Sequence, residues 1–146
     1  PGTGFLRPVS STTLTNPATA IRAITVGAYD SLTFSYADFS GRGPLTGESA
    51  SAVKPDLVAP GVNVSTISVG GSVMQFSGTS FSTPFVTGSA ALLMEWGIVR
   101  GNDSYLYGEK VKAYLRRGAK PMPGFEEYPN EAVGYGRLCL AESIPD

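Results

Sequence analysis

The stretch from Thr79 to Trp96 constrains the fold more than any other part of this chain. Its only ionisable side chain is Glu95, and small or apolar residues face every direction around a helix drawn through it. A helix that is apolar all round is normally buried in the interior of a protein. The stretch therefore predicts a buried helix at the centre of the molecule.

Short apolar runs on either side of this helix predict β-strands. Their residues are β-branched, apolar or small, and turn-forming residues bound them. Pro60-Gly61 predicts a bend between two strands, and Gly70-Gly71 predicts a hairpin. The expected extended segments are 23–29, 57–59, 62–67, 73–76 and 134–140, and the expected surface loops are 36–44 and 46–51.

A second helix is expected nearer the C-terminus. Tyr107, Val111, Tyr114 and Leu115 form an apolar stripe at helical spacing, with basic residues on the other faces. This pattern is typical of an amphipathic surface helix. Gly118 is expected to end it as a left-handed cap.

Bulk composition excludes several classes of function. The chain has 146 residues, of which 42% are hydrophobic, enough for a core, and its net charge is −1. With this balance the chain has no excess of positive charge for binding nucleic acid or an anionic membrane. No apolar run is long enough to span a membrane, and Pro1 to Phe5 lacks the pattern of a signal peptide, so any export signal is expected outside this chain.

Histidine is absent, which excludes it here as a general base or metal ligand. The single cysteine, Cys139, lies between two leucines. We expect it to be a buried structural thiol.

A serine lies where the buried helix is expected to begin. The sequence there is Ser77-Gly78-Thr79-Ser80. A hydroxyl at a helix N-terminus lies beside unpaired backbone N–H groups and the positive end of the helix dipole, which stabilise a developing oxyanion. Taken alone, Gly-Thr-Ser is a weak indication of a nucleophile, because such serines are most often ordinary helix N-caps.

The longer string from Ser77 to Gly88 resembles the nucleophile motif of the subtilisin family, with Ser80 at the nucleophile position. Phe81 stands where many members have methionine, and Phe85 where histidine is frequent; both changes keep bulk. Further segments resemble other landmarks of the family in the same order, so that the resemblance covers about residues 14 to 143. These segments are Ala23 to Asp30, Phe39 to Pro44, Lys54 to Gly61 and Gly134 to Arg137.

The resemblance implies an α/β fold, namely the C-terminal part of a subtilisin-like doubly wound parallel sheet with a central buried helix carrying the serine. It implies a serine endopeptidase that works through an acyl-enzyme, with Ser80 as catalytic nucleophile. Gly78, Thr79 and Phe81 would contact a protein or peptide substrate. The histidine, the aspartate and the asparagine of the oxyanion hole would come from upstream sequence, so the N-terminal part of the same catalytic domain would be the partner of this chain.

Residues 1–13 are expected to be a lead-in from a preceding or inserted domain, and 14–146 the C-terminal portion of the catalytic domain. Within the lead-in and just after it, two segments resemble subtilases of the spore-germination branch. They are Phe5 to Pro8 and Thr13 to Thr19. A secreted or spore-associated bacterial protein is the corresponding expectation.

One alternative function remains open. The whole protein could be an inactive subtilase-like scaffold that binds protein partners, because a fold does not guarantee its chemistry. The isolated chain, lacking a base, is expected to be inactive.

No cofactor or metal is expected, although the family's use of calcium leaves a site near Asn16 to Ala23 possible. Asp38, in a loop, and Asp56, in a strand and turn, are poor candidates for the triad acid.

Overall fold

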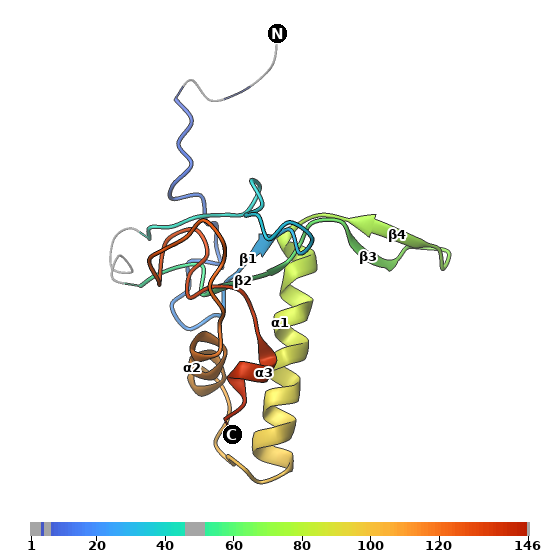
Figure 1. Ribbon diagram of the computed structural model, residues 1–146, viewed down its shortest axis with the longest axis vertical. Helices are drawn as coiled ribbons and strands as arrows, with labels where there is room; N and C mark the ends of the chain where they lie inside the picture. The colour runs from blue at the N-terminus through green and yellow to red at the C-terminus, as the bar shows by residue number, and fades with distance from the viewer. Residues whose placement is uncertain (1–3, 5–6, 46–51, 146) are drawn as a thin grey trace.

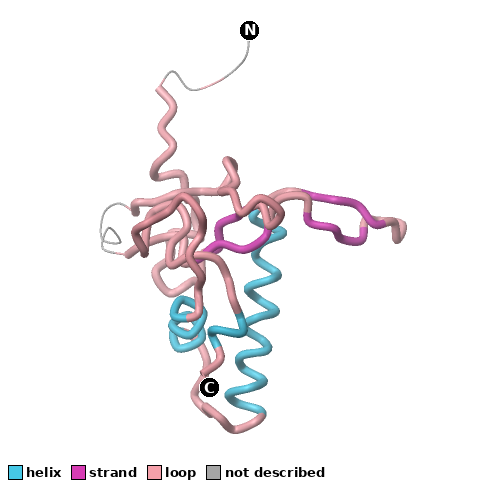
Figure 2. The backbone as a smooth tube through the Cα atoms, viewed as in Figure 1, coloured by secondary structure: helices cyan, strands magenta, loops and turns pink. Residues whose placement is uncertain are grey.

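The computed structural model describes residue 4 and residues 7–45 and 52–145, so the loop expected at 46–51 lies outside the described residues. Strands and helices occupy limited parts of the chain, and loops connect them (Figure 2). No helix in these ranges is long and apolar enough to cross a membrane. The elements are β1 (Val26–Tyr29), β2 (Leu57–Pro60), β3 (Val64–Ile67), β4 (Val73–Phe76), α1 (Thr79–Met94), a π-helical turn (Glu95–Val99), α2 (Glu109–Arg117) and α3 (Leu140–Ser143).

β1 and β2 form a small parallel sheet at the N-terminal end of α1 (Figure 1). β1 and β2 pair in parallel, and the segment before α3 runs along the other side of β2. There the N–H of Val58 donates to Gly136 O (2.9 Å), and the N–H of Leu138 donates to Val58 O (2.8 Å). The α/β architecture expected from the sequence is confirmed, and so is an extended segment within 134–140.

α1 packs one face on this sheet and thereby forms the main core. Val86 and Leu93 from α1 meet Leu57 and Ala59 from β2, and all four are almost fully buried. Leu115 from α2 closes the same cluster. Figure 1 shows α1 descending from the strands, with α2 and α3 beside its lower half.

The prediction that α1 is buried on all sides is wrong for this chain. Leu92 is 54% exposed and Phe85 is 43% exposed, although Leu93 is fully buried. The reason is that β1 and β2 cover only one side of α1. Phe85 and Leu92 are seven residues apart, so they lie on the same exposed apolar face of α1. Met94, Ile98 and Val99 are further exposed apolar residues at the end of α1 and in the π-helical turn.

The hairpin predicted at Gly70-Gly71 is confirmed. β3 and β4 pair antiparallel, and both glycines have positive φ (94° and 86°). Glycine adopts such angles without the steric cost that a side chain would incur. The hairpin projects to one side of the sheet in Figure 1, and β4 leads directly into α1.

Two details near the C-terminus differ from expectation. Gly118 ends α2 with φ −82°, so it is not a left-handed cap. It is instead a site of close packing, because a Cβ there would overlap the backbone of Ser143 in α3. Cys139 is only partly buried, since it lies at the N-terminal end of the four-residue α3 rather than inside a strand.

Candidate active site

Ser80 is the second residue of α1, and its side chain is exposed. Gly78 caps the helix with φ 154° and ψ 154°, a conformation that residues with a side chain rarely adopt. The chain therefore turns sharply out of β4 and into the helix at the glycine. The structure places the Ser80 hydroxyl at the open head of α1, as the sequence predicted.

Backbone hydrogen bonds tie this turn to the sheet. The N–H of Gly61 donates to Tyr29 O (3.0 Å), and the N–H of Gly78 donates to Gly61 O (2.8 Å). The N–H of Phe81 then donates to Gly78 O (3.0 Å). This series connects the ends of β1 and β2 to the first turn of α1, which carries Ser80.

The electrostatics of the helix head favour an anion. The first backbone N–H groups of an α-helix have no acceptor one turn earlier, and the helix dipole is positive at this end. No acidic side chain lies in the first turn of α1. The chain contains no histidine, so it provides no imidazole to take a proton from Ser80. The described residues thus place an exposed serine hydroxyl at the N-terminal end of α1, and the chain supplies no imidazole beside it.

Two stacked phenylalanine rings lie at the junction of β4 and α1. Phe81, directly after Ser80, stacks on Phe76 at the end of β4, with ring centroids 5.4 Å apart and planes at 14°. Offset stacking of this kind holds both rings in place. Phe81 therefore provides a fixed apolar surface beside Ser80.

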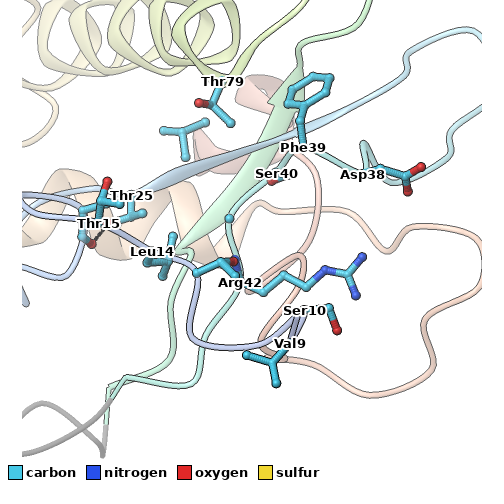
Figure 3. Close-up of a pocket in the computed structure, with 14 residues that line it drawn as sticks. Val9, Ser10, Leu14, Thr15, Thr25, Asp38, Phe39, Ser40, Arg42 and Thr79 are labelled. Carbon is cyan, nitrogen blue, oxygen red and sulfur yellow. Dashed lines mark hydrogen bonds between the residues drawn. The ribbon is translucent and has the colours of Figure 1, made fainter. Parts of the chain in front are cut away.

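A cavity of about 500 Å³ opens beside Thr79, the residue before the serine (Figure 3). Its wall is made by the segment around Leu14 and Thr15 and by the loop from Asp38 to Arg42. These two segments are joined by backbone hydrogen bonds, including Thr13 N–H to Arg42 O (2.9 Å). The cavity shares one wall with the head of α1.

Sequence reasoning missed this cavity. It identified Thr79 but not the loop residues opposite, because nothing in the sequence indicates that 12–13 pairs with 42–43. The only signal available was the position of both segments near the expected strand 23–29.

Asp56 is held in a buried cluster of cations. Its carboxylate lies 2.7 Å from Lys54 Nζ and 3.5 Å from Lys112 Nζ, and it also pairs with Arg116. It accepts a further hydrogen bond from the Thr25 N–H (2.6 Å). Burial lowers the pKa of Lys54, and the hydrogen bond and charge of Asp56 oppose that shift. These contacts occupy the Asp56 carboxylate, whereas Asp38 is exposed on the cavity rim.

Two lysine ammonium groups bind the segment 16–23, for which the family resemblance leaves a calcium site open. Lys112 Nζ donates to the carbonyl oxygens of Ile21 and Ala23, and Lys54 Nζ donates to Ala23 O (2.6 Å). Calcium prefers six to eight oxygen ligands. Two ammonium groups already occupy the carbonyl oxygens of Ile21 and Ala23.

Comparisons with known proteins agree on one family. Residues 6–136 match the sequence profile of the subtilase family. The serine protease AprX of Bacillus subtilis (strain 168) is 30% identical over 155 aligned positions, which cover 92% of this chain and 32% of AprX. The membrane-bound transcription factor site-1 protease of Mus musculus is 34% identical, covering 88% of this chain and 12% of that protein.

Solved structures give the same picture. The Clostridium perfringens CspB protease superposes with a TM-score of 0.88 at 45% identity, covering 94% of this chain and 29% of CspB. The self-cleaved protease domain of PatA superposes with a TM-score of 0.68 at 30% identity, covering 88% of this chain and 42% of that domain. The chain therefore spans about a third or less of the length of AprX and CspB.

Proposed function

The chain belongs to the subtilase family of serine proteases, and on that premise we propose that it supplies the nucleophile, Ser80, of a serine endopeptidase. The observation that carries this proposal is the exposed hydroxyl at the head of α1, beside free helix N–H groups. The histidine, the aspartate and the oxyanion-hole asparagine come from sequence outside these 146 residues.

In the proposed reaction, Ser80 Oγ attacks the scissile carbonyl carbon while the external imidazole takes the hydroxyl proton. The backbone N–H of Ser80 donates to the oxyanion that forms. The C–N bond then breaks, and the imidazole passes the proton to the leaving amine. Water hydrolyses the Ser80 ester in a second, equivalent step and regenerates the hydroxyl.

The substrate would lie across the residues around Ser80. Gly78 has no side chain to obstruct an approaching carbonyl, and Thr79 opens onto the cavity shown in Figure 3. Phe81, held by Phe76, would contact the substrate beside the scissile bond. We therefore assign substrate binding to Gly78, Thr79 and Phe81.

The exposed apolar face of α1 is the proposed contact with the N-terminal part of the catalytic domain. Its residues leave large apolar surfaces in water, which soluble monomers usually bury. That contact would bring the external histidine and aspartate to Ser80. No cofactor is needed for this chemistry. The ammonium group of Lys112 already binds the carbonyl oxygens of Ile21 and Ala23.

The test is peptide hydrolysis by a longer form of the protein that includes sequence before Pro1. Ser80→Ala is expected to reduce kcat on the order of 10⁶-fold, because nucleophile and base act as one unit. Ser72→Ala, an exposed serine in the β3–β4 turn, is the control and should retain full activity. A longer form without activity, with its fold intact, would favour the inactive scaffold.

A further inference from the structure

The first turn of α1 rests on a glycine that follows β2. A Cβ atom placed on Gly61 would overlap Ser82 Oγ and would lie 2.7 Å from Ala28 Cβ and 3.1 Å from Gly78 O. Gly61 does not adopt a positive φ, so its backbone does not require glycine. The requirement is for space between the sheet and the helix head.

Ser82 fills that space from the helix side. It is fully buried, and its hydroxyl has no hydrogen-bond partner in the part of the chain that the structure describes. A buried hydroxyl without a partner lowers stability. Ser82 therefore does not act here through a hydrogen bond, and its contribution is the contact with Gly61.

Ser82 and Ser80 point to opposite sides of one helical turn. Two residues along an α-helix correspond to a rotation of about 200°, and Ser82 is buried while Ser80 is exposed. Because the turn is hydrogen-bonded, a displacement at Ser82 moves Ser80 with it. Gly61 also accepts the Gly78 N–H (2.8 Å), so it holds the turn at two points.

We propose that Gly61 and Ser82 are positioning residues for Ser80: their contact fixes how closely the head of α1 approaches the ends of β1 and β2. The consequence for catalysis rests on the proposed role of Ser80 as nucleophile. The geometric claim does not, because it concerns only where α1 sits on the sheet.

The first test is structural and uses this chain. In a crystal structure of Gly61→Ala, Ser80 should move away from β1 and β2, since the added methyl group cannot occupy the space beside Ser82. Adding Ser82→Ala removes the overlapping oxygen and should return Ser80 part of the way. An unmoved Ser80 in Gly61→Ala would overturn the proposal.

The second test is kinetic and uses the longer, active form. A misplacement of about 1 Å can cost about 100-fold in rate, so Gly61→Ala should lower kcat by about that factor with little change in KM. Ser82→Ala added to Gly61→Ala should recover at least part of kcat. Unchanged kcat in Gly61→Ala would overturn the proposal, whereas an inactive wild type would disprove the proposed function and leave the structural test valid.

A matched control comes from the π-helical turn that follows α1. A Cβ on Gly97 would lie 2.6 Å from Leu106 Cδ2 and 2.9 Å from its Cβ, a comparable overlap far along the chain from Ser80. Gly97→Ala should lower the melting temperature while leaving kcat and the position of Ser80 unchanged. If it lowers kcat as much as Gly61→Ala does, general destabilisation explains both and the proposal fails.

Where Gly61→Ala does not fold, the double variant is compared with Ser82→Ala alone. In the double variant, the methyl group added at position 61 still meets Ala28 Cβ and Gly78 O. The kcat of the double variant should therefore be lower than that of Ser82→Ala, and equal values would contradict the positioning role.

Discussion

Ser80 and Ser82 stand two residues apart on α1 in opposite surroundings. Ser80 is exposed at the helix head, whereas Ser82 is buried and its hydroxyl has no hydrogen-bond partner among the described residues. The sequence motif indicated the first serine, because its neighbours match a nucleophile string. It could not indicate the second, because the space that Ser82 fills is created by Gly61, twenty-one residues earlier.

The unpaired hydroxyl leads to a stability prediction. Ser82→Ala removes a buried polar atom that has no partner among the described residues, so the free energy of unfolding should stay the same or rise by up to about 1 kcal/mol. Urea denaturation of this chain measures the change. A loss of more than about 1 kcal/mol would mean that the hydroxyl has a partner.

The cluster around Asp56 leads to a second prediction. Asp56→Asn removes the carboxylate that pairs with Lys54, Lys112 and Arg116, and leaves buried cations without its counter-charge. Breaking a buried pair in this way costs about 3–5 kcal/mol. Asp38→Asn, at an exposed position, should change stability by less than about 0.5 kcal/mol in the same unfolding experiment. Equal effects of the two substitutions would show that the cluster contributes little.

At the scale of elements, α1 shows where periodicity predicts well and where it does not. An apolar stretch with a single charged residue, Glu95, correctly predicted a helix from Thr79, but it also predicted burial on every side. Sequence alone cannot tell which faces of such a helix find partners within the same chain. Here β1 and β2 cover one face, and Leu92 remains 54% exposed.

Adjacent leucines in α1 test this difference directly. Leu93→Ala should lower the unfolding free energy of this chain by about 2–5 kcal/mol, because Leu93 is fully buried. Leu92→Ala should change it by less than about 0.5 kcal/mol. In the longer form, where we propose that this face is covered, Leu92→Ala should become comparably costly. A Leu92→Ala effect that is small in both forms would argue against the proposed contact.

The connection between α1 and α2 contains a pH-dependent contact. Lys110 of α2 lies 2.6 Å from the Asp103 carboxylate, and this hydrogen bond, with a smaller contribution from Tyr114, lowers the pKa of Asp103. A lowered acid pKa stabilises the fold above the unfolded value of about 4, and this stabilisation is lost as pH falls through the folded value. The stability difference between wild type and Lys110→Met should therefore shrink from about pH 6 to about pH 2. A difference that stays constant would show that the contact is not electrostatic.

For the whole molecule, the sequence predicted the α/β class, most strands and both longer helices, because each has a clear local period or turn. It could not predict the cavity beside Thr79, which depends on backbone pairing between 12–13 and 42–43. It also missed the close approach of Gly118 to α3, because such contacts join segments with no common local pattern. The domain boundaries and the spore-germination branch stay predictions.

In the proposed enzyme, Ser80 is a nucleophile whose base lies outside this chain. Labelling with a fluorophosphonate, followed by mass spectrometry of the modified peptide, tests it most directly. We expect a label on Ser80 in the longer form and none in residues 1–146 alone, because an unassisted serine hydroxyl is a weak nucleophile. A label on Ser80 in the isolated chain, or none on Ser80 in a folded longer form, would contradict it.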